Sequence, residues 1–362
     1  MLTIGVEEEY LLIDPVTGVP VTRAARVQAA AGLQPALAGD EVQRELSQAQ
    51  LEVATPVCHT LDEVGGHLLR LRHTLAQAAE SCGTRLAATG SAPFTDRLTI
   101  PLTPTPRYRR MRRQAGALAD EQLTNGMHVH VGVPDRDAGI TVLDALRPWL
   151  PVLTALAANS PLWRGRDTGF ASWRTVVFNR WPVAGPPPYF ADAEDYDRRI
   201  RRLVDTGLVD DTGQLYWHAR LSERYPTVEI RAMDVQLRVD EAVLLTGLVR
   251  ALAEHALAHP PGEPDPPEYL RAIAWHAARR GATGLLYDPL ADRIRSAREV
   301  TDGLMTLLKG PLHETGDQQR AVRLLDQLHR DGNGAARQRR ELQRGGRTGL
   351  IDMIASETVG TG

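Results

Sequence analysis

The sequence predicts an α+β fold in which helices cover one face of a sheet. Three segments alternate apolar and polar residues with the period of a strand, at 3–13, 126–133 and 227–236. Another segment, 61–82, repeats apolar residues with the period of an amphipathic helix. The stretch 268–358 reads as helical throughout, so we expect a helical C-terminal region packed on an α+β core.

The first third of the chain combines short strands with one long helix. After the strand at 3–13 and its turn, residues 42–56 predict two short strands around a polar turn. Thr60 and Glu63 match a capping box at the start of the long helix, and Gly83 stops it. The remaining elements of this third are a buried strand at 84–90 and a Pro- and Thr-rich loop at 92–107.

The rest of the chain alternates helices with strands and a long loop. The expected elements are a strand at 126–133, a helix at 141–158, a long structured loop at 161–192, a strand at 227–236 and a helix that Asp240 caps and that runs to His259. The stretch 260–267, PPGEPDPP, is the best linker candidate. We interpret 1–362 as one domain, with an α+β core at 1–259 and helices at 268–358 packed on it.

Charge and composition exclude several classes of protein. The net charge is −3 and the basic run RYRRMRR holds one aromatic residue, so we expect no nucleic-acid partner. No run of 18 apolar residues occurs, so we expect no membrane association. Two cysteines outside any CxxC pair, and a start without signal-peptide features, predict a cytoplasmic protein. The single lysine, Lys309, lies outside any Gly-Lys-Ser/Thr motif, which excludes a Walker A loop.

Two carboxylates share one face of the first strand. Glu7 and Glu9 lie two residues apart, and strand alternation points both side chains to the same side. Carboxylates in one space repel each other unless a cation neutralises them. The opposite face of this strand is mostly apolar and should meet the helices. A solvated acidic edge of the sheet is the alternative interpretation.

Two further strands repeat this pattern with other side chains. His128 and His130 share a face of the strand at 126–133, and an H-x-H pair backed by an apolar face is a metal signal. Glu229 and Arg231 share a face of the strand at 227–236. The alternatives are two hydrogen-bonded polar histidines on a half-exposed sheet, and a surface ion pair.

A fourth segment adds Glu45 and Glu52, which flank the polar turn of the 42–56 hairpin and could reach the same site. Two unrelated surface carboxylates are the alternative there. Taken together, four segments each present charged or imidazole side chains on a strand whose other face is apolar. Carboxylate oxygens suit Mg²⁺, and an imidazole among them extends tolerance to Mn²⁺. An arginine beside them would stabilise charge on a transferring phosphoryl group.

The order and spacing of these motifs resemble the type 2 glutamate–cysteine ligase family, also called YbdK-type carboxylate–amine ligases. The matching segments are GVEEEY, ELSQAQLEVATPVC, GMHVHVGVP, DTGFASWR, PTVEIRAMDVQ, AARRGATG and GNGAARQRR. The resemblance implies a glutamine synthetase-like fold, a curved antiparallel sheet whose concave face binds ATP and divalent ions and whose convex face carries helices. It also implies small-molecule substrates, a carboxylate such as glutamate and an amine, and we expect a homodimer.

The resemblance also implies roles for particular residues. The metal ligands it implies are Glu7, Glu9, Glu45, Glu52, His128 and Glu229. Arg231 would contact the phosphoryl group, His130 would lie near the amino-acid substrate, and Arg174 would bind a substrate carboxylate. Two departures concern the acceptor pocket: Asn125 stands where many members have cysteine, and the surroundings of Asn179 are more polar than usual. They predict that cysteine is a poor amine substrate.

The expected reaction is the ATP-dependent joining of a carboxylate to an amine through an acyl phosphate. The absence of a Gly-x-Ser-x-Gly motif agrees with a reaction that needs no protein nucleophile. A guanidino kinase-like phosphotransferase, a metal-dependent hydrolase built on the H-x-H pair, and a non-catalytic nucleotide- or metal-binding homologue remain alternatives.

Overall fold

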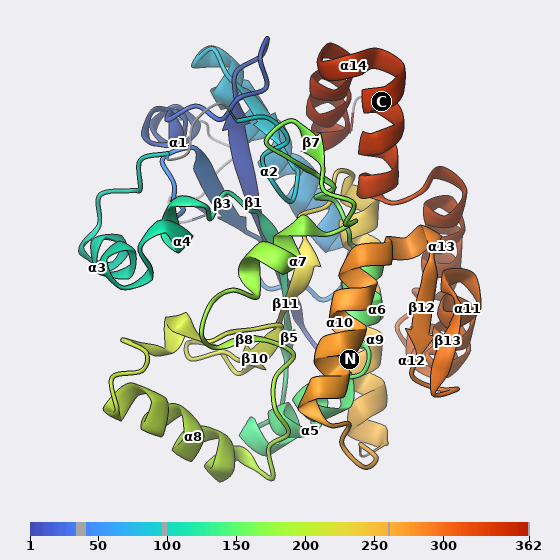
Figure 1. The fold of residues 1–362 in the computed structure, drawn as a ribbon. Coiled ribbons are helices and arrows are strands. Elements are labelled where there is room, and N and C mark those ends of the chain that lie inside the picture. Colours follow the sequence, from blue (N-terminus) through green and yellow to red (C-terminus); the bar gives the residue numbers. More distant parts are fainter. Residues whose placement is uncertain (34–40, 96–99, 260, 361–362) are drawn as a thin grey trace.

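Seven strands form one antiparallel sheet at the centre of the protein (Figure 1). The structure is a computed structural model, and it describes residues 1–33, 41–95, 100–259 and 261–360. The strand order is β10-β11-β5-β1-β3-β2, and β4 also pairs with β1. The strands are β1 (Ile4–Ile13), β2 (Val42–Arg44), β3 (Gln50–Ala54), β4 (Arg85–Ala87), β5 (Gly126–Gly132), β10 (Ala219–Leu221) and β11 (Thr227–Asp234).

The alternation predicted for the central strands is confirmed. Ile4, Val6 and Tyr10 of β1 are buried, whereas Glu7 and Glu9 point to the opposite face of the sheet and are only half-buried. Strand β5 repeats the arrangement, because its valines and its methionine are fully buried between the sheet and the helices. The sheet therefore has one apolar face and one polar face.

One charged residue lies on the apolar face and is neutralised there. Glu8 is fully buried, and it forms an ion pair with the equally buried Arg72, whose Nη2 lies 2.5 Å from Glu8 Oε1. The Tyr10 hydroxyl donates to the same carboxylate. Arg72 also donates to the carbonyl oxygens of Leu237 and Thr358, so this pair ties β1 to the end of the chain. A buried carboxylate is tolerated here because each of its oxygens accepts a hydrogen bond.

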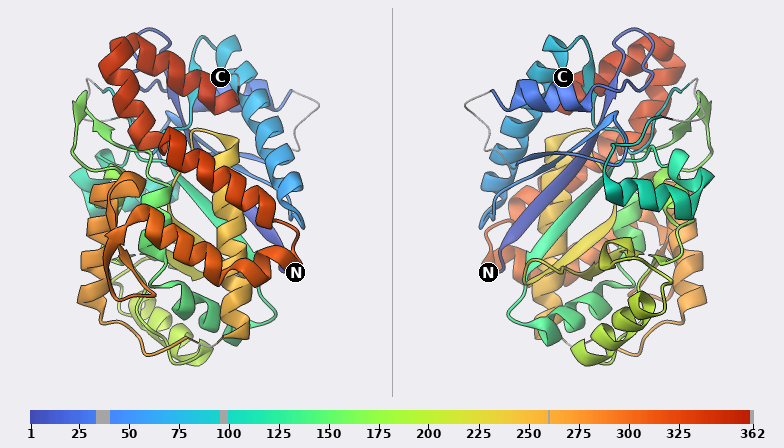
Figure 2. Two further views of the ribbon diagram at one scale, coloured as in Figure 1. Left: turned by 90° about the vertical axis from the view of Figure 1, so that its right-hand side faces the viewer. Right: turned by 90° about the vertical axis from the view of Figure 1, so that its left-hand side faces the viewer.

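Helices α2 (Leu61–Ser81), α5 (Arg136–Leu146) and α9 (Val239–Ala258) pack on the apolar face of the sheet. The capping box of Thr60 and Glu63 is present at the start of α2, and Gly83 has a positive φ of 68° just beyond its end, as predicted. Figure 2 shows α9 and the C-terminal helices on one side of the sheet, with the strands uncovered on the other side. The polar face of the sheet is therefore left for a site.

Several smaller elements complete the chain before α9. They are α1 (Ala24–Ala31), α3 (Pro106–Ala115), α4 (Ala117–Asp120), α6 (Leu150–Leu156), α7 (Trp173–Phe178), α8 (Ala193–Asp205), and the strand pairs β6 (Leu162–Trp163) with β7 (Arg166–Asp167) and β8 (Ala184–Gly185) with β9 (Tyr216–Trp217). The helix predicted at 141–158 is two helices, α5 and α6, since the chain turns between them at Pro148. Asp240 lies inside the first turn of α9, and Arg238 is its N-cap, which corrects the predicted start.

The prediction that 268–358 is entirely helical was wrong at one place. The chain from 267 to 359 folds as α10 (Pro267–Arg280), a hairpin of β12 (Leu285–Asp288) and β13 (Arg293–Ser296), α11 (Ala297–Leu307), α12 (Lys309–Glu314), α13 (Gln318–Asp331) and α14 (Gly334–Val359). The sequence PLAD between the two strands is a turn that the helical periodicity concealed. Within the described residues no single helix is long and apolar enough to cross a membrane. Only α5 and α6 taken together, with a bend of 64° between them, have the required length and apolar composition.

Ion pairs, some of them buried, attach this C-terminal region to the core. Arg337 on α14 donates to both oxygens of Glu241 on α9 and also to Glu357. Arg238, which precedes α9, pairs with Glu357 at 2.8 Å and with Asp331 at 2.9 Å. Apart from the Arg337–Glu357 pair, which lies within α14, these pairs link residues 93 to 119 positions apart. They therefore hold the C-terminal helices against the face of the sheet that is opposite the site.

Candidate active site

A cleft of about 780 Å³ lies on the polar face of the sheet. Eight residues that the sequence singled out line it together: Glu7, Glu9, Glu45, Glu52, His128, His130, Glu229 and Arg231. They come from β1, from the β2–β3 hairpin, from β5 and from β11, which are neighbours in the sheet. The volume lies in the range of pockets that take a nucleotide or another small ligand.

The register of the strands explains why these side chains meet. Glu7 is the cross-strand partner of His128, Glu9 is the partner of Glu52, and Glu229 is the partner of His130. Directly opposed residues of an antiparallel pair have Cβ atoms about 5 Å apart. A shift of one residue in any pairing would turn that strand's polar side chains toward the helices.

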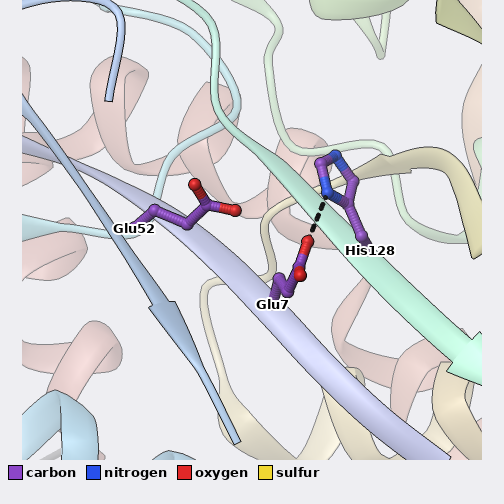
Figure 3. A group of neighbouring side chains, drawn as sticks. All are labelled: Glu7, Glu52 and His128. Atoms are coloured by element: carbon purple, nitrogen blue, oxygen red, sulfur yellow. Dashed lines mark hydrogen bonds and ion pairs between the residues drawn. The ribbon is translucent and has the colours of Figure 1, made fainter. Parts of the chain in front are cut away.

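Two groups of potential metal ligands follow from this register. Glu7, Glu52 and His128 offer ligand atoms that all lie within 4.8 Å of one another. Figure 3 shows these three side chains converging from three adjacent strands, with His128 Nδ1 3.1 Å from Glu7 Oε2. Glu7, His130 and Glu229 form the second group under the same limit, and His130 Nε2 lies 3.4 Å from Glu7 Oε1. Glu7 is common to both groups.

The carboxylates of the cleft have divergent pKa values. Burial acts to raise the pKa of Glu7, but its close contacts with His128 and His130 hold it well below its usual value. Burial raises the pKa of Glu9, Glu45 and Glu52, and the charge of Glu45 raises that of Glu52 further. Carboxyl groups that are deprotonated only at a cost are the ones that a bound cation would stabilise.

Glu229 is held between two arginines. It is almost fully buried, its Oε2 accepts from Arg220 Nε at 2.7 Å, and its Oε1 accepts from Arg231 Nη1. Burial acts to raise the pKa of Glu229, but the charges of Arg231 and Arg220 keep it far below its usual value. Glu229 Oε1 lies 3.7 Å from His128 Nδ1, so this carboxylate lies beside the histidine of the first group.

The residues of the cleft fit a divalent cation. The Nε2 atoms of His128 and His130 are buried and have no hydrogen-bond partner in the described structure. Burial and the charge of Arg231 lower the pKa of His128, which favours the neutral imidazole that can bind a metal. His130 Nδ1 lies 3.0 Å from the Thr227 hydroxyl, an arrangement that orients the ring. Unpartnered imidazole nitrogens among mutually repelling carboxylates match the donor set of Mg²⁺ or Mn²⁺.

Arg174 reaches the site from α7, behind the cleft. Its side chain is 2% exposed, and its Nη2 donates to the carbonyl oxygen of Arg231 at 3.2 Å. A Cβ atom at Gly126 would lie 2.3 Å from Arg174 Nη2, so the guanidinium occupies space that only glycine leaves free. Asp234 anchors the start of α7, because its Oδ1 accepts from the hydroxyl of Ser172, the N-cap of that helix.

The two asparagines do not line the cleft in the described part of the chain. Asn125 is fully buried, donates to the carbonyl oxygen of Thr89 and accepts from Gln50 Nε2. Asn179 accepts from His218 Nε2 at 3.0 Å. Neither side chain lines the cleft; Asn125 contacts Gln50, and Asn179 contacts His218.

Several residues of the cleft escaped the sequence interpretation. Arg220 pairs with Glu229 from β10, a strand of three residues that is too short to leave a periodic signal. Tyr225 lies in the turn between β10 and β11, is 61% exposed, and contacts the ring of His130 edge-on at 6.4 Å. Arg107 and Tyr108 of α3 also line the cleft, and they belong to the basic run that the sequence left without a clear task.

Comparison with known proteins agrees with this geometry. The family model described as glutamate-cysteine ligase family 2 (GCS2) matches residues 3–356. A glutamate–cysteine ligase 2 homologue from Nocardia farcinica is 44% identical over 340 residues, which cover 93% of this chain and 88% of that protein. A homologue from Saccharopolyspora erythraea is 42% identical over 361 residues, covering 99% of this chain and 95% of that protein.

One solved structure with the same fold is a glutamate–cysteine ligase from Francisella tularensis in complex with AMP. It has a TM-score of 0.74 and 13% identity, covering 99% of this chain and 89% of that one. A bifunctional glutathione synthetase from Pasteurella multocida has a TM-score of 0.71 and 14% identity, and this chain corresponds to 52% of its length. The predicted α+β fold with a helical C-terminal region is thereby confirmed, and the chain belongs to glutamate-cysteine ligase family 2.

Proposed function

We propose that this protein is an ATP-dependent carboxylate–amine ligase that activates the γ-carboxylate of glutamate. One observation supports the proposal above others: carboxylates, imidazoles and two arginines converge in one cleft on the polar face of the sheet. Phosphoryl transfer requires positioning and charge stabilisation rather than a protein nucleophile, and this cleft offers both. Membership of glutamate-cysteine ligase family 2 supports the same reaction class.

The proposed reaction has two steps. A carboxylate oxygen of the acid forms a bond to the γ-phosphorus of ATP, and the bond to the β–γ bridging oxygen breaks to release ADP. The amine nitrogen then bonds to the carbonyl carbon of the acyl phosphate, loses a proton, and displaces inorganic phosphate. A divalent cation held by the cleft would neutralise negative charge on the phosphates.

The protein's own groups have distinct tasks in this scheme. Arg231 would stabilise the charge that develops on the transferring phosphoryl group, and Glu229 would orient its guanidinium through their ion pair. Glu7, Glu52 and His128 would hold one cation. His130 belongs to the second group with Glu7 and Glu229, which favours a metal-ligand task for it over the substrate contact inferred from the sequence.

The remaining ligands and substrate contacts follow from the same geometry. Glu9 and Glu45 lie beside the two groups and would complete the coordination or hold it through water. Arg174 would bind a carboxylate of the acid. Mg²⁺ is the expected ion and Mn²⁺ the alternative, because the donors are carboxylates with an imidazole in each group. A cytoplasmic location and a homodimer stay predictions.

The decisive experiment is a screen for ADP release over acids and amines, with Mg²⁺ and Mn²⁺ compared and the products identified by mass spectrometry. The proposal expects ADP in equal amount to an amide. ADP release that depends on a guanidine and yields a phosphoguanidine would identify a phosphotransferase instead. Product formed without ATP would identify a hydrolase. Nucleotide binding without turnover over the whole panel would identify a non-catalytic homologue.

A further inference from the structure

A second, smaller chamber of about 70 Å³ opens behind the cleft, between α3, α7 and the sheet. It shares five lining residues with the cleft, so its open side faces the carboxylate cluster; they are Glu9, Glu45, Met111, Tyr216 and Arg231. Its deep side is formed by buried aromatic and aliphatic side chains and by a few polar groups. The deep lining comprises Leu46, Gln50, Gln122, Thr124, Arg174, Phe178 and Trp181.

The chamber contains a hydrogen-bond acceptor that has no partner. Gln50 is 1% exposed, and its Oε1 accepts no hydrogen bond in the described structure. Its Nε2 donates to the carbonyl oxygen of Thr124 at 2.9 Å and to Asn125 Oδ1 at 2.8 Å. Asn125 is fixed in turn, because its Nδ2 donates to the carbonyl oxygen of Thr89. This chain of bonds orients the Gln50 amide so that its oxygen, not its nitrogen, is free.

The chamber also contains a positive charge without a close counter-ion. Among the described residues no carboxylate oxygen lies within 4.0 Å of the Arg174 guanidinium, although the side chain is buried. Asp234, whose charge acts on Arg174, already accepts from Ser160, Ser172 and the backbone of Asn159. The Tyr216 hydroxyl is a third buried polar group without a partner. Unpaired buried polar groups are costly unless a ligand satisfies them.

We propose that this chamber binds the α-amino acid head group of the acid substrate, with its ammonium on Gln50 Oε1 and its carboxylate on Arg174. An acceptor and a cation in one chamber match the opposite charges of that head group. About 10–15 Å³ of such volume holds one water, so the chamber takes roughly five non-hydrogen atoms, the number in an ammonium, a Cα and a carboxylate. The side chain then extends through the open side toward Arg231, where its own carboxylate reacts.

This assignment rests on the proposed function for the direction of the substrate. It makes Gln50 a specificity residue and Asn125 a positioning residue that acts through it. When a ligand lacks the charged group that pairs with a buried acceptor, its binding is typically weaker by about 10- to 100-fold. An acid without an α-ammonium group should therefore be rejected by the chamber, whatever its reactive carboxylate does.

The test measures binding to the full chain by calorimetry, with Mg²⁺ and a non-hydrolysable ATP analogue present. L-glutamate is compared with glutarate, which lacks the ammonium, and with 4-aminobutyrate, which lacks the α-carboxylate. The wild-type protein should bind L-glutamate at least about 10-fold more tightly than either analogue. Equal affinity for glutarate and L-glutamate, or no measurable binding of L-glutamate, would overturn the assignment.

Two variants locate the discrimination. Gln50→Met keeps an unbranched side chain of similar size and should reduce L-glutamate binding to the level of glutarate, with glutarate binding unchanged. Gln343→Met is the matched control, since Gln343 is exposed on α14, lines neither the cleft nor the chamber, and should leave all three affinities unaltered. If Gln50→Met retains the wild-type preference, Gln50 does not read the ammonium. If Gln50→Met does not fold, the comparison of the three ligands on the wild-type protein still decides whether the ammonium group is recognised.

The outcomes separate this inference from the proposed function. ADP release with an acid that has no α-amino group would keep the ligase and remove the head-group site. Tight binding of L-glutamate with the expected discrimination, but no ADP release with any amine, would keep the head-group site and remove the ligase.

Discussion

Glu52 offers a sharp test of the metal site, because replacing it should stabilise the protein and inactivate it together. Its carboxylate offers an oxygen within 4.8 Å of a carboxylate oxygen of Glu7 and of a ring nitrogen of His128. Two unit charges at that distance interact by about 3.5 kcal/mol at an effective dielectric constant of about 20. Glu52→Gln removes this repulsion and keeps the shape of the side chain. Because burial and neighbouring charges raise the pKa of Glu52, only part of this energy is recovered at neutral pH.

The expected gain in the metal-free protein is about 1–3 kcal/mol at pH 8. A chain of 362 residues unfolds with an entropy of about 0.8 kcal/mol/K, so the melting temperature should rise by about 1–4 °C in EDTA. Mg²⁺ at a hundred times its dissociation constant should stabilise the wild-type protein by about 2.7 kcal/mol, or about 3 °C. The variant should lose most of this response, and its kcat should fall by at least about 10²-fold.

The assay is a thermal melt of wild type and Glu52→Gln, each with EDTA, Mg²⁺ and Mn²⁺, followed by steady-state ADP release. Glu80→Gln on α2 is the matched control, because Glu80 is exposed and its replacement should change neither quantity. A lower melting temperature for Glu52→Gln in EDTA would show that the cluster is not a site of repulsion. An unchanged response to Mg²⁺ would remove Glu52 from the metal site.

Three further predictions follow from the same structure. Arg231→Lys should lower kcat by at least about 10²-fold with little change in the KM for ATP, because an ammonium group cannot reproduce the planar pair of donors that a guanidinium offers. A near-normal kcat with a lower melting temperature would mean that Arg231 only forms the ion pair with Glu229. Gly126→Ala should raise the KM for the acid by about 10-fold or more while Tm falls by only a few degrees, because the new Cβ atom would displace the Arg174 guanidinium. An unchanged KM would contradict a contact between Arg174 and the acid. Burial raises the pKa of Asp144 from 3.8 to about 7, so the folded state binds a proton that the unfolded state has lost, and the stability of the wild-type protein should fall as pH rises from about 4 to 7. Thermal melts across this range should show a smaller fall for Asp144→Asn. Parallel curves of melting temperature against pH for the two proteins would refute the shift.

Much of the site was predictable because strand alternation is a local property. Residues two apart in a strand share a face whatever the partner strand is, so Glu7 with Glu9 and His128 with His130 followed from spacing alone. The capping box of α2 was equally local. The hairpin at 285–296 was missed, since its two strands of four residues lie between long helices and are too short to show a period.

The acceptor residues show a second limit of sequence reasoning. Asn125 and Asn179 were placed near the amine because they depart from related sequences, but both are hydrogen-bonded outside the cleft. A departure identifies a changed position and does not reveal which way its side chain points. The residue that faces the chamber is Gln50, which lies in the segment ELSQAQLEVATPVC but was not singled out from the sequence.

The sequence by itself determined which faces of β1, β5 and β11 are polar, because a period of two is written in the order of residues. Only the tertiary structure decided that Glu7 meets His128 and that Glu9 meets Glu52, because register depends on pairings between distant segments. The same holds for the energetic state of the site. The low pKa of one carboxylate and the raised pKa values of its neighbours arise from burial and from charges that the fold brings together.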